Sequence, residues 1–247
     1  MPETLICAAN GSYRVDIPIE QIPELHTQAE SVFWLDISDP NDQDYARLSE
    51  WFQVHPLAIE DIRHGTGRAK IEVYEGHYFI LFYAVKKDVG ARSFATQPVF
   101  IFAGEKYFVT VHQGTLVQIE ETMHRWRDPN VPPADRVGAL LYALLDTIVD
   151  DYFPLLDDVA DEAEHIEDQV FERFERSSSQ NIFALKRELL ALRRVIAPGR
   201  DVLNVLMRRE LPLFRSKDMA YLQDIYDHIL RINDSIDNYR DLLSSAL

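Results

Sequence analysis

Two adjacent carboxylates, Glu60 and Asp61, lie near the end of a short predicted helix. In proteins Mg²⁺ keeps several of its waters and is bound through one or two carboxylates. This pair, with one further carboxylate from elsewhere, would therefore suffice to hold such an ion. Adjacent acidic residues are also common on a solvated surface, and nothing in their spacing decides between the two interpretations.

A second candidate for cation binding is the stretch from Asp146 to Glu175, which contains twelve acidic residues and one arginine, Arg173. Like charges three or four residues apart on a helix cost about a few tenths of a kcal/mol per pair. Such a density is typical of a solvated helix face. It would also concentrate cations near the protein.

The histidines form no H-E-x-x-H pair, and the sequence contains no nucleophile elbow, P-loop or G-x-G-x-x-G motif. His228, which follows Asp227, is a candidate metal ligand, although its position is more typical of a residue on the polar face of a helix. The residues give almost no support to an enzyme, and we expect none.

Composition narrows the choice of partners. The chain of 247 residues has a net charge of −16, which disfavours a nucleic acid because its phosphates would be repelled. Cys7 is the single cysteine, so neither a disulfide framework nor a cysteine metal site is expected. No run approaches the ~18 apolar residues of a membrane span. Taken alone, the chain is typical of a soluble cytosolic protein.

The first half of the chain has the pattern of a sheet. The Asn10-Gly11 pair predicts a hairpin, and Asp39 and Pro40 predict the N-cap and first residue of a helix. A second, short helix is expected after His55-Pro56, and a third over residues 116–126. The predicted strands are residues 4–9, 13–17, 32–37, 69–74, 77–86, 97–102 and 106–112.

The second half predicts long helices. One pattern runs from Pro132-Pro133 to about Arg176, and after a polar turn a second runs from about Asn181 to Arg209. Pro198-Gly199 predicts either a break or a kink within the second helix. We therefore predict an α+β protein in which a sheet domain is followed by two long antiparallel acidic helices and a long C-terminal helix.

The last helix, residues 216–247, has no proline or glycine. Its apolar residues recur at steps of three and four, which predicts one buried stripe. With no stop signal before Leu247, we expect the natural chain to continue. The stripe consists of Leu222, Ile225, Ile229, Ile232, Ile236, Tyr239 and Leu243.

Several short motifs, in order over residues 31–247, together resemble the CorA-type magnesium/cobalt transporter family. His55-Pro56-Leu57 followed by Glu60-Asp61 resembles the family's H-P-L-x-x-E-D segment. Asp150-Asp151-Tyr152-Phe153 is similar to its D-D-Y-F segment, and Asp224 with Tyr226-Asp227-His228 resembles the start of its stalk helix. Further matches are Arg68-Ala69-Lys70-Ile71-Glu72, Leu185-Lys186-Arg187, Leu192-Arg193 and Pro198.

The resemblance implies a cytoplasmic α/β domain (residues 1–130), a hairpin of two "willow" helices (131–215) and a stalk helix (216–247) that leads to membrane spans. It implies a homopentamer in the cell membrane, with this part on the cytoplasmic side. Regulatory Mg²⁺ would bind where Glu60 and Asp61 face Asp224 of a neighbouring subunit, with Asp146 nearby. Asp227 and His228 are further candidates, and Co²⁺ or Zn²⁺ are alternative ions.

Two alternatives remain at this point. Zinc transporters of the ZntB type share the same layout. A soluble acidic scaffold that binds protein partners through its helices would belong to a different class. The membrane spans and the G-M-N signature at the pore mouth are not in the sequence, so this part alone is expected to regulate transport rather than to conduct ions.

Overall fold

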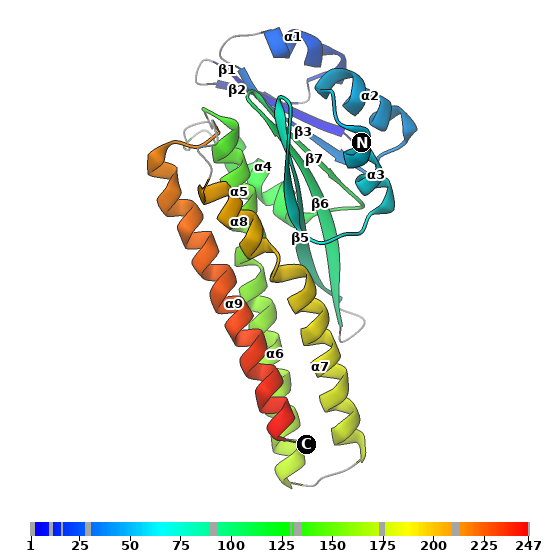
Figure 1. Ribbon diagram of the computed structural model, residues 1–247, viewed down its shortest axis with the longest axis vertical. Helices are drawn as coiled ribbons and strands as arrows, with labels where there is room; N and C mark the ends of the chain where they lie inside the picture. The colour runs from blue at the N-terminus through cyan, green and yellow to red at the C-terminus, as the bar shows by residue number, and fades with distance from the viewer. Residues whose placement is uncertain are drawn as a thin grey trace.

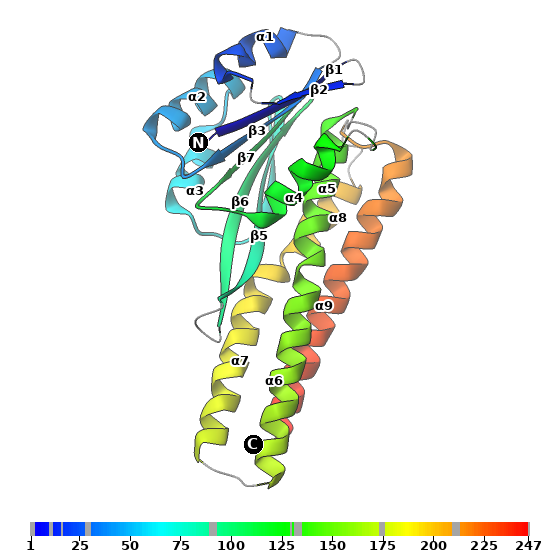
Figure 2. The ribbon, with the colours of Figure 1, turned by 180° about the vertical axis from the view of Figure 1, so that it is seen from behind.

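The computed structural model describes residues 3–9, 12–15, 17–27, 31–88, 93–128, 130, 135–172, 176–208 and 213–246. Its centre is a seven-stranded mixed sheet with the spatial order β2-β1-β3-β7-β6-β5-β4. Helices cover both faces of this sheet, and long helices extend well beyond it (Figures 1 and 2). The predicted α+β class is confirmed.

The strands lie close to the predicted positions, and β3 and β7 are the parallel pair. β1 and β2 pair antiparallel with Ala9 opposite Ser12, as the predicted hairpin requires, although its Asn10-Gly11 turn lies outside the described residues. The strands are β1 (Glu3–Ala9), β2 (Ser12–Val15), β3 (Ser31–Ser38), β4 (Lys70–Tyr74), β5 (His77–Asp88), β6 (Ser93–Gly104) and β7 (Tyr107–His112).

The sheet core is apolar on both faces. Residues 79–85 of β5 and all of β7 are buried, as expected for strands covered by helices on either side. Aromatic pairs link the strands: Phe79 lies 5.2 Å from Phe102, and Trp34 lies 5.1 Å from Phe108, ring centroid to centroid. These contacts position the helices that carry the candidate site.

The helices of the sheet domain are α1 (Ile22–Thr27), α2 (Asp42–Phe52), α3 (Pro56–His64) and α4 (Val117–Arg127), with a 3₁₀ turn, η1 (Ile19–Gln21). The prediction that Asp39 caps α2 is wrong, because the N-cap is Asn41. The Asn41 side chain accepts from the backbone N–H of Asp44, and the Asp44 carboxylate accepts from the backbone N–H of Asn41. Asp39 instead turns the chain with a left-handed φ of 52°, and its Oδ1 accepts from Gly114 N at 2.7 Å.

The start of α3 agrees with the sequence. His55 Nδ1 accepts from the backbone N–H of Leu57 at 3.2 Å, and Pro56 occupies the first turn. Gly65, with φ of 66°, ends the helix in the left-handed conformation. These signals hold Glu60 and Asp61 on a helix of fixed length.

Each arm of the predicted helical hairpin is divided in two, as α5 (Val137–Asp150) with α6 (Tyr152–Glu172) and α7 (Arg176–Ile196) with α8 (Gly199–Arg208). The prediction of one continuous helix to Arg176 is therefore wrong. The break at Pro198 is one of the two alternatives that the sequence predicted. The predicted polar turn at 177–181 is also wrong, because these residues belong to α7. Both breaks lie against β5: Tyr152 donates to the carbonyl of Tyr83, and Gly199 packs on the ring of Phe82.

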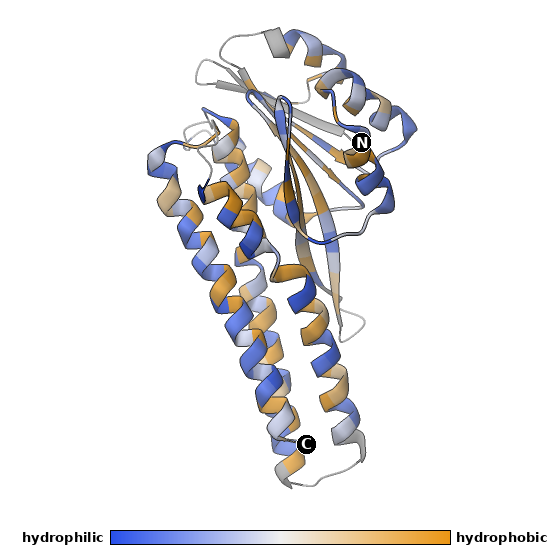
Figure 3. Cartoon of the chain, in the orientation of Figure 1, coloured by the Kyte–Doolittle hydropathy of each residue, from blue (hydrophilic) through white to orange (hydrophobic). Residues whose placement is uncertain are grey.

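The C-terminal helix is α9 (Met219–Ser245), preceded by the 3₁₀ turn η2 (Ser216–Asp218). Its apolar stripe is confirmed: all members are buried except Tyr239, which is partly buried. The stripe packs on α5, α6, α7 and α8, and polar residues occupy the opposite face (Figure 3). None of the helices in the described ranges combines the length and apolarity of a membrane span.

Candidate metal centre

Four acidic and histidine side chains meet where α5 and α9 run side by side. Asp146 and Asp150 are four residues apart on α5, and Asp224 and His228 are four apart on α9, so each pair projects from one helix face. His228 Nδ1 lies 3.4 Å from Asp150 Oδ1, and its Nε2 lies 3.6 Å from Asp224 Oδ2. We call these four residues the α5–α9 cluster.

The cluster carries more negative than positive charge. Burial and the neighbouring carboxylate of Asp150 raise the pKa of Asp146, although a hydrogen bond from Tyr142 opposes this. Burial raises the pKa of Tyr142 to about 12, with Asp146, Asp224 and Asp150 adding to the effect. The side chains of Asp150 and Asp224 are 56% and 64% exposed, so the cluster opens to solvent.

His228 is the least satisfied member. Its Nδ1 is buried and has no hydrogen-bond partner among the described residues, since the contact with Asp150 lacks hydrogen-bond geometry. Phe153 packs edge-on against the imidazole with ring centroids 5.2 Å apart, and the Arg231 guanidinium lies over the Phe153 ring, 5.4 Å from its centroid. The imidazole is thus held in place by packing rather than by its polar atoms.

Within the described residues, Asp227 does not interact with the α5–α9 cluster. It is exposed, and its Oδ1 accepts a hydrogen bond from Gln223 Nε2 at 2.9 Å along the same helix.

The other predicted ligands lie on α3. Asp61 Oδ2 pairs with Lys70 Nζ at 2.8 Å, and the same ammonium lies 2.7 Å from Glu72 Oε1. Tyr74 donates its hydroxyl proton to Glu72 at 2.8 Å. Glu60 is exposed and forms no hydrogen bond or ion pair within the described residues.

In this second group, hydrogen bonds between oppositely charged side chains together have more effect on the pKa values than burial has. Burial alone would lower the pKa of Lys70, but the bonds to Asp61 and Glu72 outweigh it and raise the pKa. For Glu72 burial would raise the pKa, and the bonds from Lys70 and Tyr74 outweigh it and lower the pKa.

One chain does not bring the two groups together. Both views place α3 and α9 on opposite sides of the sheet (Figures 1 and 2). Within the described part of the chain, no three histidine, cysteine or acidic side chains are arranged to hold a metal ion. Asp146 and Asp224 therefore share a cluster, whereas Glu60 and Asp61 lie apart from it.

Sequence reasoning missed several residues of these groups. Asp150 was recognised only as part of a motif, although its spacing of four from Asp146 placed it on the same helix face. The pairing of Lys70 with Asp61 had no local signal, because it joins a helix to a strand.

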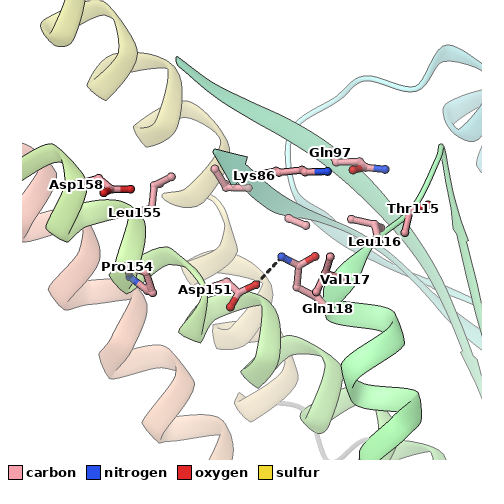
Figure 4. Close-up of a pocket in the computed structure, with 12 residues that line it drawn as sticks. Lys86, Gln97, Thr115, Leu116, Val117, Gln118, Asp151, Pro154, Leu155 and Asp158 are labelled. Atoms are coloured by element: carbon pink, nitrogen blue, oxygen red, sulfur yellow. Dashed lines mark hydrogen bonds between the residues drawn. The ribbon is translucent and has the colours of Figure 1, made fainter. Parts of the chain in front are cut away.

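A cavity of about 370 Å³ lies beside the break between α5 and α6 (Figure 4). Gln118 Nε2 donates to Asp151 Oδ2 at 2.6 Å on its wall, and Lys86 and Asp158 lie at its edges. None of the predicted ligands lines it.

Comparison with known proteins decides the family. Residues 29–247 match the family described as "CorA-like Mg2+ transporter protein". The chain belongs to the CorA family. Over its whole length it is 32% identical to the cobalt/magnesium transport protein CorA of Thermotoga maritima, of which it covers 75%. The family predicted from the motifs is confirmed.

Solved structures of the CorA family have the same fold. The soluble domain of CorA from Methanocaldococcus jannaschii has a TM-score of 0.79 and 22% identity, covering 98% of this chain and 94% of that one. The ZntB cytoplasmic domain from Vibrio parahaemolyticus has the same TM-score with 13% identity, covering 100% and 96%. The chain therefore shares its fold with a CorA soluble domain and with a ZntB cytoplasmic domain.

The donor types of the α5–α9 cluster are ones that divalent cations bind, although within the described part of one chain no three of them are arranged to hold an ion. Three carboxylates supply the oxygen ligands that Mg²⁺ prefers, and two of them are solvent-exposed, so a bound ion could keep its waters. His228 adds a nitrogen that Co²⁺ or Zn²⁺ accepts more readily than Mg²⁺ does.

Proposed function

We propose that this chain is the cytoplasmic, metal-responsive part of a divalent cation transporter of the cell membrane. The observation that carries the proposal is the α5–α9 cluster, in which Asp150 and Asp224 lie beside His228. Asp146, whose pKa burial raises, lies near enough to Asp150 for that carboxylate to raise it further, whereas Arg125 opposes this rise. Membership of the CorA family supports magnesium and cobalt as the transported ions.

The regulatory site is proposed to be shared between copies in a homopentamer. Asp224 and Asp146 of one subunit would meet Glu60 and Asp61 of the next, because one chain keeps the two groups apart. Glu60 has no partner in the described residues, and Asp61 has only Lys70. A carboxylate set divided in this way can be completed only by assembly.

The chain's own residues would then respond to the ion through electrostatics. Without a cation, carboxylates of two subunits face one another and repel, and the interface loosens. When Mg²⁺ is bound, it offsets that repulsion and favours the assembled state by its differential affinity for the two states. A site of few carboxylates and retained waters binds weakly, as a sensor of cellular Mg²⁺ requires.

His228 favours a second candidate, a ZntB-type zinc transporter domain. Its buried Nδ1 has no hydrogen-bond partner and lies 3.4 Å from a carboxylate oxygen. An imidazole nitrogen beside carboxylates suits Zn²⁺ better than Mg²⁺. The ZntB cytoplasmic domain shares the fold, which leaves the zinc assignment open to test.

The direct test is limited proteolysis in rising Mg²⁺ concentrations. Protection of the unaltered protein should saturate, and Asp224→Ala should lose most of it. Asp234→Ala removes an exposed aspartate elsewhere on α9 and serves as the matched control. Equal protection of Asp224→Ala and Asp234→Ala would contradict the site. Protection by Zn²⁺ at much lower concentration, abolished by His228→Ala, would favour the zinc candidate.

A further inference from the structure

The outer face of α6 carries a row of unpaired carboxylates. The exposed residues Asp157, Asp161, Glu164 and Asp168 follow one another at steps of four, three and four, so they form one stripe along the helix. Within the described residues none of the four forms a hydrogen bond or ion pair. The opposite face of α6, with Leu155, Val159, Ala163 and Ile166, is buried. We call the four acidic residues the acidic stripe.

The outer face of α7 carries a stripe of the same spacing and opposite character. Phe183, Arg187, Leu190 and Arg194 also follow at steps of four, three and four, and all are exposed. Phe183 and Leu190 are 55% and 38% exposed, among the largest exposed apolar side chains of the described chain. We call these four residues the basic stripe.

The arginines of the basic stripe form no hydrogen bond or ion pair within the described residues, although the charge of Arg187 acts on the neighbouring Glu188. Their neighbours on α7 are used differently: Arg193 bonds to Asp237 at 3.0 Å, and Lys186 donates to Ser244 at 2.7 Å, both across to α9. The cations that face the bundle are therefore satisfied. The ones that face outward are available to another surface.

The two stripes match in length and charge spacing. Each spans twelve residues, so its ends are eleven steps or about 16 Å apart at ~1.5 Å per residue. Arg187 and Arg194 are seven residues apart, as are Asp157 and Glu164, so two oppositely charged pairs can form at once on antiparallel helices. Phe183 and Leu190, which alternate with the arginines, would be covered by the same contact.

The stripes cannot satisfy each other within one chain, because α6, α7 and α9 pack through their inner faces and both stripes remain exposed (Figures 1 and 2). We propose that the basic stripe of α7 docks onto the acidic stripe of α6 in a second copy of this chain. Different surfaces meet, so the contact is heterologous and builds a ring when the rotation closes.

The hairpin itself predicts the register. Glu162 on α6 lies near enough to Glu188 on α7 for its charge to raise the pKa of Glu188, after burial, so these two residues stand at similar heights in the hairpin. Copies in a ring whose axis follows the helices stand at the same height. The seven-residue spacing then pairs Arg187 with Glu164 of the next copy and Arg194 with Asp157.

This inference rests on the part of the proposed function that assembles copies, and it is independent of the metal site. The test is oxidative cross-linking of the 247-residue chain in a Cys7→Ser background, without divalent cations. Leu190→Cys with Asp161→Cys should give a ladder of dimers and larger species. Each single variant should give none, and an equimolar mixture of the two singles should give dimers alone. Leu190→Cys with Glu50→Cys, an exposed residue on α2, is the matched control.

Charge exchange supplies the second measurement. In sedimentation equilibrium, Arg187→Glu with Arg194→Glu should weaken self-association about tenfold. Adding Asp157→Arg and Glu164→Arg to the same chain should restore it. Two cross-linking results would overturn the proposal: a ladder no stronger than that of the Glu50→Cys control, or dimers from Leu190→Cys alone. Binding of α7 to phosphatidylserine vesicles in place of the ladder would also overturn it. A ladder that forms without Mg²⁺ protection would retain it and refute the metal site instead.

Discussion

Lys70 Nζ lies 2.8 Å from Asp61 Oδ2, so one of the two carboxylates proposed to reach a neighbouring subunit already has a cation beside it. The same ammonium holds Glu72. A metal ion that uses Asp61 must therefore compete with Lys70. This competition would weaken the site, and it would keep Asp61 oriented when no ion is bound.

Removal of that competitor should strengthen metal binding. Lys70→Met keeps the aliphatic stem and leaves Asp61 without its cation, so the dissociation constant for Mg²⁺ should fall about two- to fivefold. Isothermal titration of the assembled protein measures this. Lys217→Met, an exposed lysine beyond the site, makes the same charge change and should leave the constant unaltered. Weaker binding by Lys70→Met would show that Lys70 supports the site rather than competes with it.

Asp146 should make stability depend on pH. Burial and Asp150 raise its pKa, so the folded state binds this proton more tightly than the unfolded state does. The free energy of unfolding then falls as pH rises from about 4 through the raised pKa. At neutral pH and without metal, Asp146→Asn should raise Tm by roughly 1–2 °C, because the group is half exposed and its charge is screened.

Addition of Mg²⁺ separates this effect from simple charge removal. The gain in Tm on adding Mg²⁺ should be smaller for Asp146→Asn than for the unaltered protein, since a ligand is lost. Asp234→Asn removes one charge from an exposed position and should keep the full gain. An undiminished gain in Asp146→Asn would exclude Asp146 from the site.

His77 should contribute a pH dependence of the opposite sign. His77 is 3% exposed and lies between the rings of Tyr74 and Phe102. In the described part of the chain neither ring nitrogen has a hydrogen-bond partner, and burial lowers the pKa of the imidazole. Because the unfolded state binds this proton more tightly, stability is lost as pH falls below about 6.5.

His77→Phe should remove that loss, because the aromatic packing is kept and the titrating group is not. Urea unfolding at pH 5 and pH 7.5 measures the difference in the free energy of unfolding. His64→Phe, at an exposed position, should keep the pH dependence of the unaltered chain. If His77→Phe retains the same dependence, another group causes it.

Gly138 should not tolerate a side chain. A Cβ at this position would lie 2.0 Å from the carbonyl oxygen of Leu213, which approaches α5 directly. Helix propensity alone predicts that Gly138→Ala stabilises the chain by about 1 kcal/mol. The backbone clash predicts a loss of about 1–3 kcal/mol instead, so the sign of the change in urea denaturation decides between the two.

Local patterns explain which features could be predicted. The buried stripe of α9 follows from the spacing of its isoleucines, and the start of α3 from His55-Pro56. Asp39 was chosen as a cap because it precedes proline, whereas Asn41 is favoured by its reciprocal bonds with Asp44. Both residue types cap helices, so composition alone could not separate them.

The helix breaks and the charge pairs depend on distant parts of the chain. Asp151 lies in a sequence that favours a continuous helix, and the break there coincides with the bond from Tyr152 to Tyr83 on β5. The pairs of Asp61 with Lys70 and of His228 with Asp150 join residues far apart in sequence. The proximity of Asp146 to Asp224 was expected from family resemblance, because no periodicity links two separate helices.

The central claim is that the metal site is divided between copies, and mixing two defective proteins tests it most directly. Asp224→Ala removes one half of the site, and Glu60→Ala with Asp61→Ala removes the other. When the two proteins assemble together at random, about a quarter of the interfaces would hold both intact halves. The account predicts that Mg²⁺ protection from proteolysis, absent in each protein alone, returns in part after co-assembly. Protection no greater than the average of the two proteins alone would contradict it.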